Sequence, residues 1–303
     1  MNYFKTSSLA ACAALLIMAL VACSAHKHDN FIDRLNDYIA SCDAEIGVCA
    51  VIDDNEIIMI DGRKSFPMQS VVKLFQAIAV IDELEDSGLT FEYGETVDTL
   101  DLHRDTYSPL RDSDPDGGFY TYELLLDYSL RLSDNNASDI LYDRLRFVEQ
   151  CDSFLHENFQ LSGFKLAVTE RQMHENHELA QMNRTTPFAA AMLMNEFFNR
   201  DSFRPDLKQA VEQMLYSCQT GANRLPAGLK DTEARIAHKT GTGFANSDGI
   251  VASVNDVGYV VLPDGTHYAI SVLVNNSRVP LQETEAMIAH ISKMVYDYVM
   301  SLK

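Results

Sequence analysis

The stretch SVVKLFQAIAVI at residues 70–81 decides how the rest of the sequence is interpreted. It begins with a serine and a lysine three positions apart and continues as an almost unbroken apolar run. Residues at i and i+3 lie on the same face of a helix, so the ammonium of Lys73 can reach the hydroxyl of Ser70. A serine hydroxyl becomes a good nucleophile only when a neighbouring base removes its proton. The stretch therefore predicts a buried helix, ending near Gly88, with a reactive serine at its start.

The S-x-x-K pattern is weak evidence by itself, because it also occurs at residues 24–27 and 162–165. The first of those copies lies in the polar tether after the apolar N-terminal run, and the second precedes a loop without an apolar helix behind it. Two further motifs favour Ser70: SDN at residues 133–135, between two helical patterns, and KTGT at residues 239–242, at the end of a predicted strand. In this order the three motifs resemble those of the active-site serine penicillin-recognising enzymes, which include the class A β-lactamases. The resemblance extends from about Ile32 to the end of the chain.

This resemblance implies a role for each motif residue in opening a β-lactam ring. Ser70 attacks the lactam carbonyl, while the backbone N–H groups of Ser70 and Thr242 hold the developing oxyanion. Ser133 passes a proton to the departing nitrogen, helped by Lys73 and Lys239. The resemblance assigns catalysis to Ser70, Lys73, Ser133 and Glu170, and substrate binding to Tyr107, Asn135, His174, Arg224, Lys239, Thr240, Gly241 and Thr242. We expect no cofactor and no metal.

The stretch TERQMH at residues 169–174 distinguishes a β-lactamase from relatives that remain acylated. Class A enzymes carry a glutamate between the second and third motifs, usually as E-x-x-L-N, and this glutamate activates the water that releases the acyl group. Here Met173 takes the apolar position and His174 replaces the asparagine. Glu170 and His174 are at i and i+4, so both side chains can hold one water. The alternatives are a penicillin-binding D,D-peptidase, or a sensor that is acylated and stays so.

The loop around Glu170 departs from the usual class A pattern. Val168 stands where an arginine is usual and Asn183 stands where its salt-bridge partner is usual, so the bridge that normally braces the loop is missing. Asp139 replaces an asparagine that helps to hold a cis peptide bond after the glutamate. We therefore expect a trans bond between Glu170 and Arg171 and a differently folded loop.

The set of His174, Asn183 and Asp139 resembles the PER-type subgroup of class A, which has a widened cleft and hydrolyses cephalosporins with bulky side chains. Another replacement agrees with this subgroup. Asp248 stands where many class A enzymes carry an arginine, and Arg224 resembles the alternative arginine of PER-type enzymes. The resemblance thus implies an extended-spectrum cephalosporinase in which Arg224 supplies a cation for the substrate carboxylate.

Strand patterns lie at both ends of the chain, and helical patterns lie between them. The expected strands are residues 47–52, 57–60, 234–238, 249–262 and 267–274, and helices are expected at 31–42 and 281–302. We predict an α+β fold with two lobes that form a single catalytic unit. An antiparallel five-stranded sheet with flanking helices takes residues 23–66 and 221–303, and an all-helical lobe takes residues 67–220. The pocket is expected where the lobes meet.

The strongly negative composition limits which partners the protein can bind. The 303 residues carry a formal charge of −20, which argues against nucleic acid because phosphates must be neutralised by Lys and Arg. A few cations in a cleft must therefore create any anion site. The histidines at positions 174 and 177 do not have the i, i+4 spacing of a zincin helix, so we expect no metal there. We expect a monomer that binds a small-molecule β-lactam.

The N-terminus predicts export from the cytosol. Lys5 precedes an apolar run that is too short to span a bilayer, and the run ends in LVAC at residues 20–23, which resembles a lipobox. The resemblance implies a signal peptide over residues 1–22, lipid attachment at Cys23 and a periplasmic location. An ordinary secretory signal is the alternative. Four further cysteines, Cys42, Cys49, Cys151 and Cys218, allow three full disulfide pairings, and buried free thiols are equally compatible with the sequence.

Overall fold

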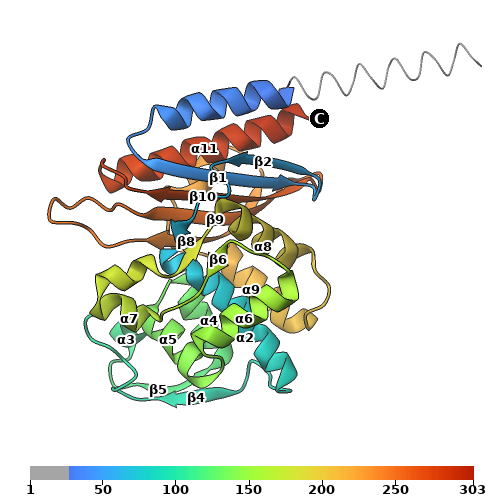
Figure 1. Ribbon diagram of the computed structural model, residues 1–303. Helices are drawn as coiled ribbons and strands as arrows, with labels where there is room; N and C mark the ends of the chain where they lie inside the picture. The colour runs from blue at the N-terminus through green and yellow to red at the C-terminus, as the bar shows by residue number, and fades with distance from the viewer. Residues whose placement is uncertain (1–26) are drawn as a thin grey trace, which may run out of the picture.

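The computed structural model describes residues 27–303, so the predicted signal peptide and Cys23 lie outside the described residues. Within this range the five predicted strands form one antiparallel sheet, in the order β2-β1-β10-β9-β8. The strands are β1 (Glu45–Ile52), β2 (Glu56–Ile60), β8 (Arg235–Thr242), β9 (Val254–Val261) and β10 (His267–Asn275). The α+β prediction is confirmed. Figure 1 shows the sheet above a separate group of helices.

Strand β9 is shorter than its sequence pattern predicted. It begins at Val254, whereas a strand was expected from residue 249. Asn246 accounts for the difference, because its side-chain oxygen accepts hydrogen bonds from the N–H groups of Asp248 at 3.0 Å and Ile250 at 2.9 Å. Such side-chain bonds turn the chain and compete with strand pairing. Residues 243–253 therefore form a loop, and Phe244 of this loop lines the cavity between the two lobes.

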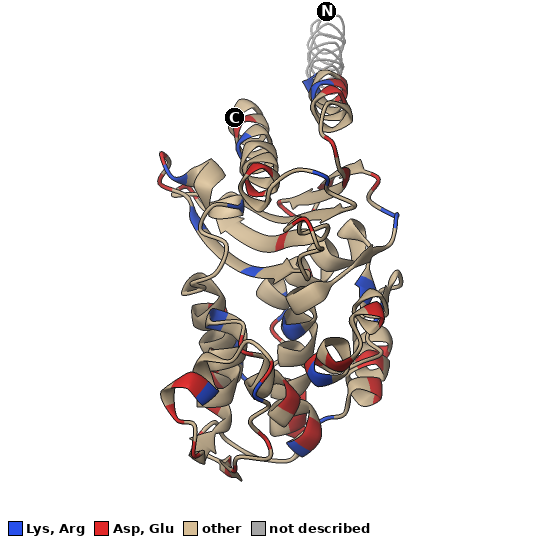
Figure 2. Ribbon diagram, turned by 90° about the vertical axis from the view of Figure 1, so that its left-hand side faces the viewer, with Lys and Arg blue, Asp and Glu red and all other residues tan. Residues whose placement is uncertain are grey.

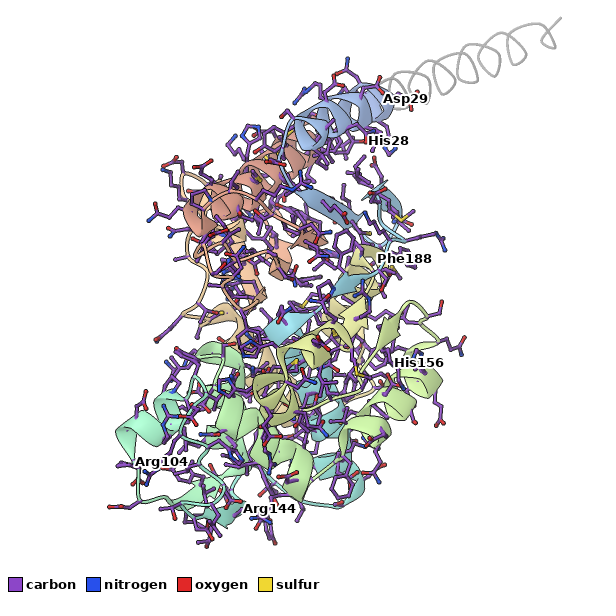
Figure 3. The ribbon with its side chains drawn as sticks, turned by 60° about the vertical axis from the view of Figure 1, so that its left-hand side comes forward. His28, Asp29, Arg104, Arg144, His156 and Phe188 are labelled. Carbon is purple, nitrogen blue, oxygen red and sulfur yellow. The ribbon has the colours of Figure 1, made fainter. Side chains whose placement is uncertain are left out.

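Helices cover both faces of the sheet, which explains why β1, β9 and β10 are buried along nearly their whole length. The helix at residues 27–40 and α11 (Leu281–Ser301) lie together on one face, and α8 (Pro187–Asn199) lies on the other (Figure 1). The side chain of Phe188 marks the start of α8 in Figure 3. Helix α8, which was predicted as part of the helical lobe, shares the apolar core of that lobe and also packs against the sheet. This helix is apolar on nearly every side, so it can be buried against the sheet and the helical lobe at once.

The helical lobe is built around α2 (Val72–Asp86), of which eleven of fifteen residues are buried. Around α2 lie α4 (Tyr122–Arg131), α5 (Asn135–Arg144), α6 (Val148–Phe159) and α9 (Pro205–Tyr216). Helix α2 ends as predicted, because Gly88 takes a positive φ of 63° and lets the N–H of Leu89 reach the carbonyl of Leu84 at 2.8 Å. In Figure 3, His156 marks α6, and Arg104 and Arg144 lie at the far end of this lobe.

The lobe is not purely helical, which corrects the sequence prediction. Short strands form a hairpin, β4 (Gly94–Val97) with β5 (Gly118–Thr121), and a three-stranded group, β3 (Phe66–Pro67), β7 (Arg184–Thr185) and β6 (Phe164–Lys165). The remaining short elements are 3-10 helices η1 (Gln69–Val71) and η2 (His177–Gln181) and helices α3 (Pro109–Ser113), α7 (Glu170–Glu175) and α10 (Leu225–Leu229). Two-residue strands give no periodicity that a sequence can reveal.

Acidic residues occur in both lobes, and many of them lie in the helical lobe (Figure 2). No described helix has the length and apolar character needed to cross a membrane. The four described cysteines are free thiols: Cys49 and Cys151 are buried, and Cys42 and Cys218 are partly exposed. Free thiols were one of the two alternatives that the sequence left open.

Candidate active site

A cavity of about 390 Å³ lies where the two lobes meet, and both lobes supply its walls. Residues of the predicted site that line it are Ser70, Tyr107, Ser133, Asn135, Glu170, His174, Thr240 and Thr242. Five further residues also line it: Gln69, Thr106, Met173, Thr220 and Phe244. The structure therefore gathers around one cavity residues that are up to 175 positions apart in the sequence, from Gln69 to Phe244.

Ser70 lies in η1, directly before the buried helix α2, beside a pair of buried charged groups. The Lys73 ammonium donates a hydrogen bond to Ser70 Oγ at 2.9 Å and forms an ion pair with Glu170 Oε1. Glu170 Oε1 is itself 3.5 Å from Ser70 Oγ. The side chains of Lys73 and Glu170 are 0% and 7% exposed, so little solvent weakens their attraction. One ammonium thus contacts both the hydroxyl and the carboxylate, as a proton relay requires.

The backbone before Ser70 is held against the sheet. Asn255 on β9 donates from Nδ2 to the carbonyls of Pro67 at 2.8 Å and Met68 at 3.0 Å. A Cβ atom on Gly241 would lie 2.4 Å from the Met68 carbonyl oxygen, so only glycine lets β8 approach this closely. This approach brings Thr242 and Ser70 to the same cavity, which the predicted oxyanion site requires.

Gln69 and Ser133 both have backbone conformations in the left-handed region, with φ of 50° and 60°. Non-glycine residues rarely adopt this region, and those that do are often found at functional sites. Ser133 Oγ accepts a hydrogen bond from the Lys239 ammonium at 2.9 Å. Lys239 is completely buried, and this burial lowers the pKa of its ammonium to about 8. The second and third motifs therefore meet as a serine–lysine pair, of which Ser133 lines the cavity.

Asn135 links the Lys73 ammonium to Thr106 in the cavity wall. Its Oδ1 accepts a hydrogen bond from Lys73 at 2.8 Å, and its Nδ2 donates one to Thr106 Oγ1 at 2.7 Å. The sequence prediction did not include Thr106, although it directly precedes Tyr107. Tyr107 lines the cavity and is 57% exposed, as expected for the aromatic wall at the cleft mouth.

Glu170 is positioned by its backbone. The Asp139 carboxylate accepts hydrogen bonds from the N–H groups of Glu170 at 2.9 Å and Arg171 at 2.8 Å. Burial and the negative charge of Glu170 raise the pKa of Asp139 to about 8, although the two N–H groups oppose this shift. No described peptide bond is cis, so the bond between Glu170 and Arg171 is trans, as predicted.

The loop before Glu170 has a brace that the sequence did not reveal. Asn183 is fully buried, and its Oδ1 accepts hydrogen bonds from the N–H groups of Ala167 at 2.8 Å and Val168 at 3.1 Å. Its Nδ2 donates to the Val168 carbonyl at 2.9 Å. A buried amide that satisfies three backbone groups thus replaces the missing salt bridge.

Two aromatic rings, those of Phe244 and His174, line the cavity, and the ring of His177 packs against them. Phe244, in the loop after β8, stacks on His177 with ring centres 3.7 Å apart and an angle of 9° between the planes. His174 lies 6.2 Å from the Phe244 ring, and it shares helix α7 with Glu170 as the sequence predicted. Among residues 27–303, no group of histidine, cysteine and acidic side chains is arranged to hold a metal ion.

Arg224 lies behind the cavity wall, rather than among the residues that line it. Only 3% of the residue is exposed, and its guanidinium donates to Glu285 Oε1 at 3.1 Å and to Thr242 Oγ1 at 2.7 Å. It also donates to the carbonyls of Gly241 at 3.1 Å and Asn255 at 3.0 Å. Its charge is therefore paired with Glu285, and it reaches the cavity through Thr242. No sequence motif marked Glu285, which lies 61 positions away in α11.

Of the two other S-x-x-K copies, only the one at residues 162–165 lies wholly within the described range. Lys165 there forms an ion pair with Asp152 at 2.6 Å, so its ammonium is engaged away from the cavity. Thr220, which the prediction missed, shares a 2.6 Å hydrogen bond with Thr240 across the site. In the sequence, Thr220 could have been recognised by its position directly before Gly221 and close to the predicted Arg224.

The sheet lobe and the helical lobe meet at a cavity where a serine lies beside two buried lysines, as the three sequence motifs of the penicillin-recognising enzymes predicted. The chain belongs to the class A β-lactamases and is thus a hydrolase acting on β-lactams, because the model of the β-lactamase enzyme family matches residues 30–299. A β-lactamase of Phocaeicola vulgatus is 33% identical over 270 residues, covering 88% of this chain and 84% of the relative.

Two further relatives come from Pseudomonas aeruginosa. The β-lactamase VEB-1 is 32% identical over 89% of this chain and 90% of its own length, and the extended-spectrum β-lactamase PER-1 is 29% identical over 81% and 79%. Among solved structures, the TLA-1 extended-spectrum β-lactamase superposes with a TM-score of 0.85 at 31% identity, covering 89% of this chain and 98% of the other.

Proposed function

We propose that this β-lactamase works through an acyl-enzyme on Ser70, which a water activated by Glu170 then hydrolyses. The observation that carries the proposal is the position of the Lys73 ammonium, which contacts both the Ser70 hydroxyl, at 2.9 Å, and the Glu170 carboxylate. The Glu170 carboxylate therefore lies beside the Ser70 hydroxyl and can accept a proton that comes from Ser70 or from a water next to it. Both halves of the reaction need a proton acceptor there.

In the first half, the Ser70 oxygen attacks the lactam carbonyl carbon while its proton moves to Lys73 and a Lys73 proton moves to Glu170. The tetrahedral oxyanion is held by the N–H groups of Ser70 and Thr242. When the carbon–nitrogen bond breaks, Ser133 donates its hydroxyl proton to the nitrogen. The proton held by Glu170 then returns through Lys73 to the Ser133 oxygen, so that Glu170 is a carboxylate again, while the ammonium of Lys239, 2.9 Å from Ser133 Oγ, stabilises that oxygen and keeps its own charge.

In the second half, Glu170 removes a proton from a water, and the hydroxide attacks the ester carbon. The ester bond breaks and the Ser70 oxygen recovers a proton through Lys73. His174 shares α7 with Glu170 and lines the same cavity, so its ring orients this water. The hydroxyls of Thr240 and Thr242 and the Lys239 ammonium hold the substrate carboxylate, and Arg224 supports them through its bond to Thr242.

We further propose that the substrates include cephalosporins with bulky side chains, as in PER-type enzymes. Three features support this assignment: the trans peptide after Glu170, the carboxylate of Asp139 beneath it and the Asn183 amide that holds the loop. The Glu170 loop therefore follows a path set by backbone hydrogen bonds. The 29% identity to PER-1 agrees with this proposal.

The test combines burst kinetics with mass spectrometry on a chromogenic cephalosporin. Wild-type protein should turn over many times, whereas Glu170→Ala should open one ring per molecule and retain the acyl mass, with kcat reduced about 10²–10⁴-fold. Glu175→Ala is the matched control, because Glu175 lies on the same helix but is exposed. Stoichiometric acylation of the wild type would instead indicate a D,D-peptidase or an acylated sensor. Unchanged turnover by Glu170→Ala would remove Glu170 from the mechanism.

The sequence before the described residues supports a proposal on location. The apolar run and the Cys23 lipobox favour export to the periplasm with lipid attachment at Cys23. Metabolic labelling with a fatty acid should mark the wild type and leave Cys23→Ser unlabelled. Equal labelling of both would exclude Cys23 as the lipid site.

A further inference from the structure

The mouth of the cavity is formed by residues 98–108, an irregular segment between β4 and α3. Thr106 and Tyr107 of this segment line the cavity. Thr106 is buried, and its hydroxyl accepts the hydrogen bond from Asn135. Because the segment is neither helix nor strand, groups from other elements must bind its backbone carbonyls and hold it in place.

Arg111, in the short helix α3, supplies three of these hydrogen bonds. Its Nη1 donates to the carbonyls of His103 at 2.7 Å, Arg104 at 2.7 Å and Thr106 at 2.8 Å. Its Nε and Nη2 donate to Asp112 Oδ1 at 3.1 Å and 2.6 Å, which fixes the orientation of the guanidinium. The Arg111 side chain is only 18% exposed, and charged donors form stronger hydrogen bonds than neutral ones. Three carbonyls of one segment therefore converge on a single charged nitrogen.

The ends of this stretch are held separately, by residues next to the second motif. Asn136 Oδ1 accepts a hydrogen bond from the His103 N–H at 3.1 Å, and the Asn135 N–H donates to the Tyr107 carbonyl at 3.1 Å. Between these two anchors, the carbonyls of residues 104 and 106 bind Arg111. Arg111 is not among the residues that line the cavity, and the mechanism above makes no use of it.

We propose that Arg111 is a positioning residue, which fixes the mouth of the substrate cavity by holding the backbone of residues 103–106. Without its guanidinium, the Thr106 hydroxyl and the Tyr107 ring should occupy several positions, so that a β-lactam binds productively less often. The acyl-enzyme, once formed, should be hydrolysed at its usual rate, because Ser70 and Glu170 keep their contacts with Lys73. This kinetic consequence rests on the proposed function, whereas the effect of Arg111 on the segment does not.

The kinetic test is Arg111→Met, which keeps a long apolar side chain and removes the guanidinium. With a chromogenic cephalosporin, kcat/KM should fall about 10–100-fold, mainly through a higher KM, because a misplaced binding group lowers the chance of a productive complex. The rate at which a preformed acyl-enzyme is released should change by less than about 2-fold. An equal decrease in both rates would place Arg111 in the hydrolytic machinery and overturn the positioning role.

Two matched controls separate positioning from charge. Arg104→Met removes the same charge from the same segment, but Arg104 is exposed and takes part in the Arg111 contacts only through its carbonyl. Asp112→Asn weakens the ion pair of a carboxylate that is 64% exposed and leaves Arg111 Nη1 in place. Both should keep kcat/KM within about 2-fold of wild type. A loss in Arg104→Met as large as in Arg111→Met would show that the positive charge matters and the three carbonyl bonds do not.

A spectroscopic test follows the mouth directly and needs no turnover. The chain has no tryptophan, so Tyr107→Trp places a single fluorophore at the cavity mouth. Adding Arg111→Met to Tyr107→Trp should lower the fluorescence anisotropy, whereas adding Arg104→Met should leave it unchanged. Unchanged anisotropy with Arg111→Met would overturn the proposal even if kcat/KM falls.

Amide exchange distinguishes local positioning from general stability. In Arg111→Met, exchange in residues 103–107 should accelerate at least about 3-fold, while α2 and the main sheet exchange as in wild type. Acceleration throughout the chain would indicate a loss of overall stability and would also overturn the proposal. Failure of the wild type to hydrolyse the cephalosporin would refute the proposed function instead, and the fluorescence and exchange results would still decide the role of Arg111.

Discussion

Replacing Arg224 with alanine should destabilise the fold although Arg224 lies beside the active site. The guanidinium makes four hydrogen bonds between parts of the chain that are far apart in sequence, and one of them is an ion pair with Glu285. The side chains of Arg224 and Glu285 are 4% and 11% exposed. Removing the guanidinium therefore leaves a buried carboxylate without its partner and three oxygen acceptors without a donor.

The magnitude follows from the burial. Breaking a buried ion pair from one side costs about 3–5 kcal/mol, because the remaining charge stays away from water. For a protein of this size that loss corresponds to a decrease in Tm of roughly 6–20 °C. Adding Glu285→Gln to Arg224→Ala removes the unpaired charge, so the double variant should recover at least about 1 kcal/mol.

Urea unfolding followed by circular dichroism measures these differences. Arg278→Ala is the control, because its side chain is 77% exposed and its contact with Asp43 is 3.5 Å long. This control should change the free energy of unfolding by less than about 0.5 kcal/mol. A loss below about 1 kcal/mol for Arg224→Ala, or no recovery in the double variant, would show that the Arg224–Glu285 pair does not hold the structure together.

Three further predictions concern the cavity. Asp139→Asn should cost about 1–3 kcal/mol in urea unfolding and slow deacylation in pre-steady-state kinetics, because its amide nitrogen cannot accept the N–H bond that a carboxylate oxygen now accepts beside Glu170. The kcat/KM for carboxylate-bearing β-lactams should fall above about pH 8, because burial lowers the pKa of Lys239 to about 8 and its charge is lost as the pH rises through that value. Phe244→Ala removes the stacking on His177, worth about 0.5–1.5 kcal/mol, so amide exchange in residues 243–253 should accelerate roughly 2–13-fold by mass spectrometry.

Each of these three has a control. Asp143→Asn changes an exposed carboxylate that pairs with Arg171 at 2.8 Å, and it should leave stability and deacylation nearly unchanged. A β-lactam ester without a free carboxylate should not show the decrease above pH 8, and equal decreases for both substrates would contradict the role of Lys239. Exchange in the loop at the wild-type rate after Phe244→Ala would show that the ring does not anchor it.

The sequence predicted the parts of the fold that carry strong periodicity. The five main strands and the α2 helix follow runs of apolar residues, and the structure confirms them. It did not predict that α8 also packs against the sheet, because a helix that is apolar on all sides gives no indication of which partner it packs against. The start of β9 was also missed, since the turn depends on one side chain, Asn246.

The sequence predicted those parts of the site whose residues lie in local sequence motifs. Ser70 with Lys73, and Ser133 and Lys239 in their own tripeptides, come together in the structure as expected. The side chains that position them were not predictable, because they lie in other elements and are ordinary residue types. Asn255 is an example: it is an unremarkable asparagine in a strand pattern, yet its amide holds the backbone before Ser70.

The Glu170 loop shows what a departure from a family pattern can predict and what it cannot. The absence of the usual salt bridge at Val168 and Asn183 predicted a loop without a brace. In the structure, however, Asn183 accepts two hydrogen bonds from the loop backbone and donates one to it, and Asp139 accepts two more. Each contributes about 0.5–1.5 kcal/mol, whereas an exposed salt bridge contributes about 0–1 kcal/mol. The loop is thus held at least as firmly as a salt bridge would hold it, and a lost motif residue implies a changed loop path rather than a mobile general base.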